Sequence, residues 1–260
     1  MSKPLDLKAR LDFAISIAKD LSELQLKYNS ENLTTERKGD DSPVTKADLE
    51  SEAYFRKKVA EAFPGDLVLG EEQGEEVGDG PRWVIDPIDG TRKFMRGLPF
   101  WGICLAFEVD SEVQIGVIAV PGAGKIWSAL KGEGAFCDGQ KISVDNEIND
   151  LSRAFITMPS RPYFVKDSFK EAFDQTQEWI EHDPGFLDAY SYGMVADGRL
   201  HGVLSCSDMW WDIAAAVCII EEAGGVFRSV DGGPPREGSL NLAASKQCFD
   251  LLMKKLKPIL

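Results

Sequence analysis

Two aspartates stand three residues apart where an apolar stretch ends in the first half of the chain. Trp83 to Ile85 form the stretch, and the sequence Asp86-Pro87-Ile88-Asp89 follows it directly. A carboxylate at the end of a buried strand is costly unless it is paired or coordinated. Oxygen ligands with no histidine or cysteine beside them suit a hard cation such as Mg²⁺. The spacing predicts either a cation site or an Asx turn at a strand–helix junction, and it leaves both interpretations open.

Gly90 and Thr91 come next, and they can begin a short helix that runs to Met95. The first N–H groups of a helix have no partner within it, and the positive end of its dipole lies there. Such a helix start suits a phosphate group. A metal ion and a phosphate would thus meet at one turn of the chain.

Two further acidic residues stand at comparable places. Glu71 follows the short apolar segment Leu67 to Leu69, and Asp212 begins a strongly apolar helical stretch. Because Glu71 and its neighbour Glu72 point to different sides, one of them can reach a metal ion. A pair of glutamates is nevertheless common on protein surfaces, and aspartate is a favoured residue at a helix N-cap. Each element by itself therefore has an ordinary structural interpretation.

The acidic residues of the chain are unevenly distributed. The 260 residues include 29 Lys and Arg against 43 Asp and Glu, a formal net charge of −14. Residues 61–90 hold nine of these carboxylates and a single base, Arg82. The balance argues against a broad nucleic-acid or anionic-membrane surface, which needs an excess of basic groups. The acidic window itself predicts either a solvated loop or a cation site.

The remaining composition indicates a cytoplasmic protein. The five cysteines are scattered without a Cys-x-x-Cys pair, as expected of reduced thiols rather than a disulfide framework or a zinc site. The beginning of the chain shows no apolar segment typical of a secretory signal. The longest apolar run, Ile213 to Ile220, is too short to span a bilayer.

The hydrophobic pattern divides the chain into two parts. Amphipathic helices are expected over 5–28 and 49–63, with a polar loop over 29–44 between them. Short segments rich in β-branched and aromatic residues then predict a mostly antiparallel sheet, with strands at 67–70, 82–86, 101–109, 114–120 and 125–130.

Beyond residue 150 the pattern alternates between strands and helices. Strands are expected at 154–158, 201–205, 226–229 and 240–244, and helices at 166–181, 187–197, 211–223 and the end of the chain. We therefore expect an N-terminal α+β domain over 1–150, with the antiparallel sheet and most candidate ligands, and a C-terminal α/β domain over 151–260 that completes the site. No flexible linker marks the boundary near 145–152, so the two should pack tightly.

Taken together, the acidic elements match a family pattern. The segments Gly70-Glu71-Glu72, 83–91 with Phe94, 211–225 and 41–48 resemble the inositol monophosphatase family in order and spacing, along nearly the whole chain. This family comprises Mg²⁺-dependent, lithium-sensitive phosphatases of sugars and polyols. The resemblance implies a layered αβαβα sandwich of the inositol monophosphatase and fructose-1,6-bisphosphatase type, α+β with an α/β half.

The resemblance also implies a set of metal ligands. Glu71, Asp86 and the backbone carbonyl of Ile88 would hold one Mg²⁺, and Asp86, Asp89 and Asp212 a second. A third, weaker ion would lie near Glu71, so two to three ions are expected in each site. Two metal ions can stabilise the attacking and leaving oxygens of an in-line displacement, and they lower the pKa of a bound water.

Further roles follow from the same resemblance. Thr91, supported by Asp48, matches the pair that orients the attacking water, and Glu71 would also take part in catalysis. The N–H groups of Gly90 and Thr91 would bind phosphate oxygens. Lys38 corresponds to a lysine on a mobile loop near the metals. The family is often dimeric, so a homodimer is possible.

The substrate is a small phosphate monoester, and two candidates stand out. Residues 94–102 and the segment that begins Asp188-Ala-Tyr-Ser-Tyr192 resemble the histidinol-phosphatase branch. An acid such as Asp188 could pair with the ammonium or imidazolium group of histidinol phosphate, or it could be a surface residue of a helix. We therefore rank histidinol phosphate above inositol 1-phosphate, and a nucleotide or sugar bisphosphate third.

One position departs from the family pattern. Seven residues before Asp212, where the family usually has an acid that binds substrate, this chain has Ser205. Serine can hydrogen-bond a hydroxyl group but cannot neutralise a cation, and Asp208 could serve instead.

The sequence can also be compared with two classes of protein that are not enzymes. A non-catalytic, regulatory homologue would be favoured by loss of the metal ligands, and all of them are present. A Ca²⁺-binding EF-hand needs a different ligand spacing from that of Asp86 to Gly90.

Overall fold

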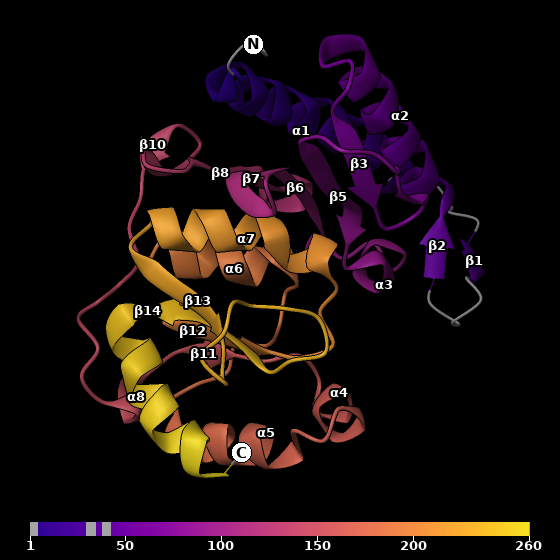
Figure 1. Cartoon of the computed structure of the whole chain (residues 1–260). Coiled ribbons are helices and arrows are strands. Elements are labelled where there is room, and N and C mark those ends of the chain that lie inside the picture. The colour runs from indigo at the N-terminus through magenta and orange to yellow at the C-terminus, as the bar shows by residue number, and fades with distance from the viewer. Residues whose placement is uncertain (1–4, 30–34, 38–42, 260) are drawn as a thin grey trace.

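Helices and sheets alternate in layers. The computed structural model describes residues 5–29, 35–37 and 43–259. In Figure 1 the layers follow from top to bottom in the order helix, sheet, helix, sheet, helix. The expected αβαβα sandwich is therefore confirmed.

The larger sheet contains the acidic turn. Its strand order is β10-β9-β8-β7-β6-β5-β3-β4, and neighbours are antiparallel except for the parallel pair β3 and β5. The strands are β3 (Leu67–Gly70), β4 (Gly74–Glu75), β5 (Arg82–Asp89), β6 (Gly102–Val109), β7 (Glu112–Val120), β8 (Lys125–Leu130), β9 (Gly134–Cys137) and β10 (Gln140–Lys141). The mostly antiparallel sheet agrees with the prediction, whereas β4, β9 and β10 were not expected, because they are only two to four residues long.

The smaller sheet belongs to the second half of the chain. Its strand order is β11-β12-β14-β13, with β11 and β12 parallel and the other neighbours antiparallel. The strands are β11 (Ile156–Thr157), β12 (Gly202–Ser205), β13 (Gly225–Ser229) and β14 (Asn241–Ser245).

Three groups of helices cover the faces of these sheets. They are α1 (Leu7–Asn29), α2 (Lys46–Ala62), α3 (Thr91–Phe94), α4 (Arg161–Lys166), α5 (Lys170–Trp179), α6 (Ala189–Ala196), α7 (Trp210–Glu222) and α8 (Lys246–Leu256), with 3₁₀ turns at Pro121–Ala123, Leu151–Arg153 and Lys257–Ile259. Helices α1 and α2 lie on the outer face of the larger sheet, α6 and α7 lie between the sheets, and α5 and α8 lie beyond the smaller sheet.

Helix α7 comes unusually close to the larger sheet. A Cβ at Gly116 of β7 would stand 2.2 Å from the carbonyl oxygen of Ala215. Only glycine fits there, and the run Ala214 to Ala216 keeps the facing surface of α7 thin. The same hydrophobic cluster contains Ile118 from the first half of the chain and Phe227 from the second. The division at 145–152 stays a prediction, and the two parts share this core.

The structure corrects the sequence prediction at three places. The segment 29–44, expected to be a loop, contains the antiparallel strands β1 (Thr35–Arg37) and β2 (Pro43–Thr45). The helix expected over 166–181 is the shorter α5 (Lys170–Trp179). Helix α4 (Arg161–Lys166) before it was not expected, and Ser168 between the two adopts a left-handed conformation with φ 67°. Strand β5 extends beyond Asp86 to Asp89, with a shift in its pairing register to β6 between the two aspartates.

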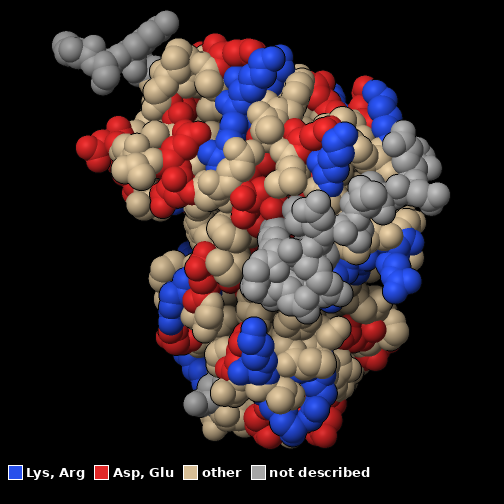
Figure 2. Space-filling model, turned by 90° about the vertical axis from the view of Figure 1, so that its right-hand side faces the viewer, with Lys and Arg blue, Asp and Glu red and all other residues tan. Residues whose placement is uncertain are grey.

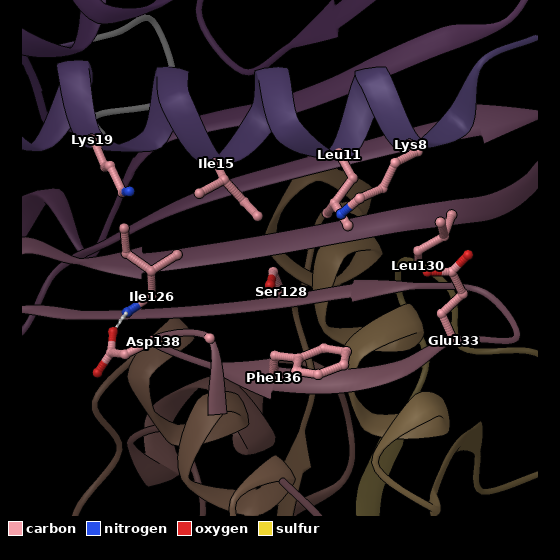
Figure 3. Close-up of a pocket in the computed structure, with 11 residues that line it drawn as sticks. Lys8, Leu11, Ile15, Lys19, Ile126, Ser128, Leu130, Glu133, Phe136 and Asp138 are labelled. Atoms are coloured by element: carbon pink, nitrogen blue, oxygen red, sulfur yellow. Dashed lines mark hydrogen bonds between the residues drawn. The ribbon is translucent and has the colours of Figure 1, made fainter. Parts of the chain in front are cut away.

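A groove of about 550 Å³ opens beside α1, away from the acidic turn. In Figure 3 the side chains of Leu11 and Ile15 point from α1 toward Ile126 and Phe136 on β8 and β9. The residues that line the groove are separate from the candidate site residues.

The surface carries mixed charge. Figure 2 views the molecule from the right of Figure 1, and on the described part of that face Lys and Arg lie interspersed with Asp and Glu. Across residues 5–29, 35–37 and 43–259, no helix is both long enough and apolar enough to cross a membrane. All five cysteines are free, as expected of reduced thiols.

Candidate metal and phosphate site

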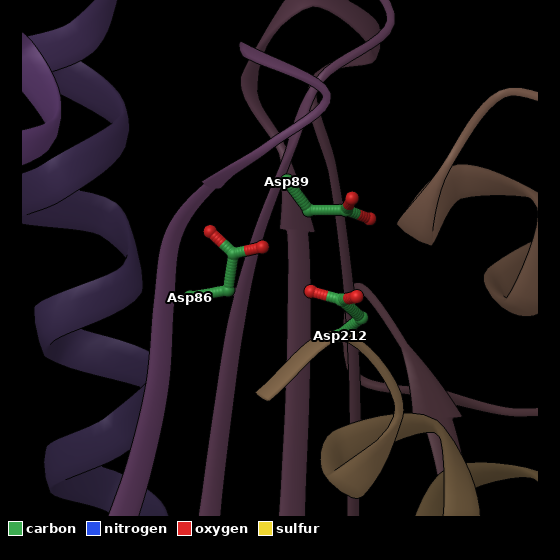
Figure 4. Close-up of side chains that lie close together, drawn as sticks. All are labelled: Asp86, Asp89 and Asp212. Atoms are coloured by element: carbon green, nitrogen blue, oxygen red, sulfur yellow. The ribbon is translucent and has the colours of Figure 1, made fainter. Parts of the chain in front are cut away.

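Three aspartates from distant parts of the chain converge. Asp86 and Asp89 come from the end of β5, Asp212 comes from the first turn of α7, and Figure 4 shows their carboxylates pointing toward one another. One oxygen from each lies within 4.8 Å of the others. Asp86 is buried, whereas Asp89 and Asp212 keep part of their surface accessible. The cluster therefore opens on one side.

Local hydrogen bonds define the turn between Asp86 and Asp89. Asp86 Oδ1 accepts from the Ile88 N–H at 2.9 Å, an Asx turn. The Thr91 hydroxyl lies 3.1 Å from the Ile88 carbonyl oxygen and 3.4 Å from Asp48 Oδ1, so it can donate to either. The two sequence interpretations are thus compatible, because the Asx turn uses one oxygen of Asp86 while the carboxylate still faces the cluster.

Asp212 belongs to the carboxylate cluster and also stabilises the start of α7. It is the third residue of α7 rather than its N-cap, and its Oδ2 accepts from the Met209 N–H at 2.8 Å. The start of α7 is attached to the larger sheet by Trp210, whose indole N–H donates to Glu108 of β6. Glu108 in turn accepts from Arg82 Nε at 2.9 Å. This chain of contacts brings Asp212 from the second half of the molecule to the aspartates of the first.

The carboxylates of the cluster repel one another. Removal from water, followed by the charges of Glu71, Asp89 and Asp212, raises the pKa of Asp86 well above its usual value. Burial also raises the pKa of Asp89 and of Asp212. Several carboxylates held this close together lack a neutralising positive charge. A hard divalent cation such as Mg²⁺, which prefers oxygen ligands, would supply it.

Glu71 adjoins the cluster from the end of β3. Its negative charge raises the pKa of Asp86, Asp48 and Asp212. The loop that carries it is held by Glu52 of α2, a fully buried residue that the sequence analysis missed. Glu52 accepts from the Glu72 N–H at 2.7 Å and the Gln73 N–H at 3.0 Å. Its only sequence signal is Arg56 one helical turn later, which donates to it at 2.9 Å.

Asp48 occupies the first turn of α2, because the helix begins at Lys46 and not at residue 49 as predicted. Its Oδ2 accepts from the Thr45 N–H at 2.9 Å and from the Thr45 hydroxyl, which completes a capping box. Burial raises the pKa of Asp48 to about 6, against the lowering effect of the Thr45 hydrogen bonds. Asp48 is thus ionised at neutral pH and can accept a hydrogen bond from Thr91.

Asp188 is not a surface residue of a helix. It stands before α6, its side chain is only 16% exposed, and it forms an ion pair with Lys93 of α3. Its Oδ2 would come 2.4 Å from a Cβ at Gly90, which itself has φ 92°. Glycine is therefore required there for both conformation and space. The next N–H, of Ala189, donates to Asp89.

Ser205 and Asp208 belong to one buried network. The Ser205 hydroxyl donates to Asp208 Oδ2 at 2.7 Å and accepts from the Tyr192 hydroxyl at 3.0 Å. Asn241 Nδ2 also donates to Asp208, at 3.1 Å. Ser205 and Asp208, the two alternatives for a substrate contact, are therefore hydrogen-bonded to each other. Lys38 lies outside the described residues.

The fold and the site define a metal-dependent hydrolase whose carboxylate cluster joins the two halves of the chain. Comparison with known proteins specifies the family: the model of the inositol monophosphatase family matches residues 6–259. The chain belongs to this family, and it is a phosphoric monoester hydrolase.

Three relatives illustrate the similarity. The chain is 36% identical over 217 residues to a histidinol-phosphatase of Chlorobaculum parvum, which covers 83% of each chain. It is 30% identical over 239 residues to human inositol monophosphatase 1, covering 86% of this chain and 84% of the relative. The solved structure of an IMPase from Thermotoga maritima superposes with a TM-score of 0.87 at 27% identity, covering 96% of this chain and 98% of the other.

Proposed function

We propose that this protein hydrolyses histidinol phosphate with the help of two to three Mg²⁺ ions. The observation that carries the proposal is the Asp86, Asp89 and Asp212 cluster, which lies beside the hydroxyl and carboxylate of Thr91 and Asp48. Glu71, Asp86 and the carbonyl of Ile88 would hold one ion, and Asp86, Asp89 and Asp212 another. When bound, Mg²⁺ supplies the positive charge that activates water and stabilises the transferring phosphoryl group.

Thr91 and Asp48 would orient the attacking water. A hydroxyl that donates to a carboxylate has its lone pairs free to accept from another donor. Thr91 donating to Asp48 can therefore accept a hydrogen bond from water and fix its direction, and Glu71, itself a proposed metal ligand, would also take part in catalysis. The N–H groups of Gly90 and Thr91 would bind phosphate oxygens.

Asp188 supports a substrate with a positive group. Its carboxylate lies against Gly90, next to the proposed phosphate site, and is largely buried. There it can pair with the ammonium or imidazolium group of histidinol phosphate. The higher identity to the histidinol-phosphatase relative than to the inositol monophosphatase, 36% against 30%, supports the same choice.

Inositol 1-phosphate is the second candidate, and one observation favours it. Lys93 already neutralises Asp188, so this carboxylate is less available to a cationic substrate than to a hydroxyl group. A nucleotide or sugar bisphosphate ranks third.

A panel of substrates with detection of released phosphate tests these assignments. We expect histidinol phosphate to have a higher kcat/KM than inositol 1-phosphate, with activity abolished by chelation of Mg²⁺. A preference of about tenfold or more for inositol 1-phosphate would reverse the ranking. Hydrolysis of no phosphate monoester by protein that binds Mg²⁺ would instead favour the regulatory homologue. Light scattering of the purified protein tests the predicted homodimer.

A further inference from the structure

The turn between the two metal-site aspartates leaves the β-ladder. Asp86 pairs with Cys104 and Asp89 with Gly102, and the register shifts between these pairs. The carbonyl of Pro87, in the middle of the turn, needs a hydrogen-bond donor from elsewhere, because buried backbone carbonyls are rarely left without one.

Gln25 of α1 supplies that donor from 62 positions earlier in the chain. Its Nε2 lies 2.7 Å from the Pro87 carbonyl oxygen and 3.3 Å from the Ser51 hydroxyl oxygen. Its Oε1 accepts from the Trp101 indole N–H at 2.9 Å. Gln25 is fully buried, and each end of its amide has a partner that matches its chemistry. The orientation of the amide is therefore determined on both sides.

The same turn is anchored by apolar packing. Ile88 is fully buried in a small cluster with Ala47, Phe94 and Trp101. The ring of Trp101 packs edge-on against that of Phe94, with centroids 5.0 Å apart. Trp101 thus both contacts the Ile88 cluster and orients Gln25. The apolar cluster and Gln25 hold the backbone of the turn at two consecutive residues, Ile88 and Pro87.

We propose that Gln25 is a positioning residue of the metal site: by binding the Pro87 carbonyl, it fixes the separation and direction of the Asp86 and Asp89 carboxylates. The inference rests on the proposed function, because it requires that these aspartates bind Mg²⁺. Gln25 does not touch the ion or the substrate. Its contribution is to hold the turn in the metal-binding conformation before the metal binds.

Calorimetric titration of the chelator-treated protein with Mg²⁺ tests the proposal. Gln25→Met keeps a similar volume and removes both the donor and the acceptor. We expect its Kd for Mg²⁺ to rise about tenfold or more, while kcat at saturating Mg²⁺ stays within about threefold of the wild type. Trp101→Phe keeps a smaller aromatic ring and removes the N–H donor that orients Gln25, so we expect a smaller rise in the same direction.

Arg10→Met is the matched control on the same helix. Arg10 is buried and pairs with Asp66 at 2.8 Å, so its loss should lower the Tm without touching the turn. An unchanged Kd for Mg²⁺ in Gln25→Met, or an equal rise in Arg10→Met, would overturn the proposal. If Gln25→Met does not fold, an unchanged Kd in Trp101→Phe overturns it as well. Wild-type protein that binds no Mg²⁺ would refute the proposed function itself, a result distinct from these.

Discussion

Lys93 and Asp188 form an ion pair that connects α3 to the residue before α6. The ammonium group also lies 5.9 Å from the centre of the Phe186 ring. Asp188 adopts φ 50° and ψ −136°, a conformation that favours glycine, so the backbone is strained where the carboxylate meets Gly90. Lys93 therefore pairs with the Asp188 carboxylate, which in the proposed function binds the cationic group of the substrate.

This ion pair should determine the choice between charged and neutral substrates. In Asp188→Asn we expect kcat/KM for histidinol phosphate to fall about tenfold or more, because the partner of the substrate cation is lost. The value for inositol 1-phosphate should change by less than about threefold. Steady-state kinetics with both substrates measure the difference. An equal loss for the two would show that Asp188 does not recognise charge.

Removing the lysine should have the opposite effect. Lys93→Met leaves Asp188 available to the substrate cation, so we expect a lower KM for histidinol phosphate and little change in KM for inositol 1-phosphate. A higher KM for histidinol phosphate alone would mean that Lys93 holds Asp188 in place instead of competing with the substrate.

The metal ligands should be essential for turnover and unfavourable for stability without metal. We expect Asp89→Asn to lose several orders of magnitude in kcat, because it removes a charge from the cluster. Its metal-free form should be at least as stable as the wild type, since burial and the neighbouring Asp188 already disfavour the ionised Asp89. Kinetics and thermal unfolding in chelator check both parts. Retention of more than about a tenth of the activity would refute the two-metal assignment.

The stability of the metal-free protein should depend on pH in a defined direction. The folded-state pKa values of Asp86, Asp89 and Asp212 lie well above the usual 3.8. The stability that these groups contribute is therefore fully present below their unfolded-state pKa and is lost as the pH rises through the raised values.

We expect the Tm in chelator to fall as the pH increases from about 5 to about 8. Mg²⁺ should raise the Tm more at the higher pH, because it binds the ionised carboxylates. Thermal unfolding across this range, with chelator or with Mg²⁺, measures both effects. A Tm in chelator that rises with pH would contradict the assignment of the cluster.

The Thr91 hydroxyl should matter for catalysis and not for the fold. Thr91→Val keeps the shape and removes the group that would orient water, so we expect kcat to fall about a hundredfold or more. Thr176→Val is the control, because the Thr176 hydroxyl is buried on α5 without a hydrogen-bond partner among the residues that the structure describes. That variant should keep its activity and be no less stable. Equal activity of Thr91→Val and wild type would refute the role in catalysis.

Much of the site could be predicted because it is encoded locally. The spacing of Asp86, Gly90 and Thr91 places their groups within one turn, and the cap of α2 at Thr45 to Asp48 follows from residues three apart. Periodicity also located most strands and helices, because each has one face in a continuous core. The short strands β4, β9 and β10 were missed because so few residues show no period.

By itself, the sequence determined the types of the ligands, their local turns and, through the family resemblance, the layered fold. Only the tertiary structure decided which distant groups form an ion pair or a hydrogen bond with each other. Lys93 and Asp188 are 95 positions apart, and Gln25 and Pro87 are 62 apart. Such pairs form when the packing of helices and strands brings polar groups into contact. No local sequence pattern indicates which groups will be in contact. The physical reason is that burial leaves each polar group in need of a partner, while packing decides which partner it finds.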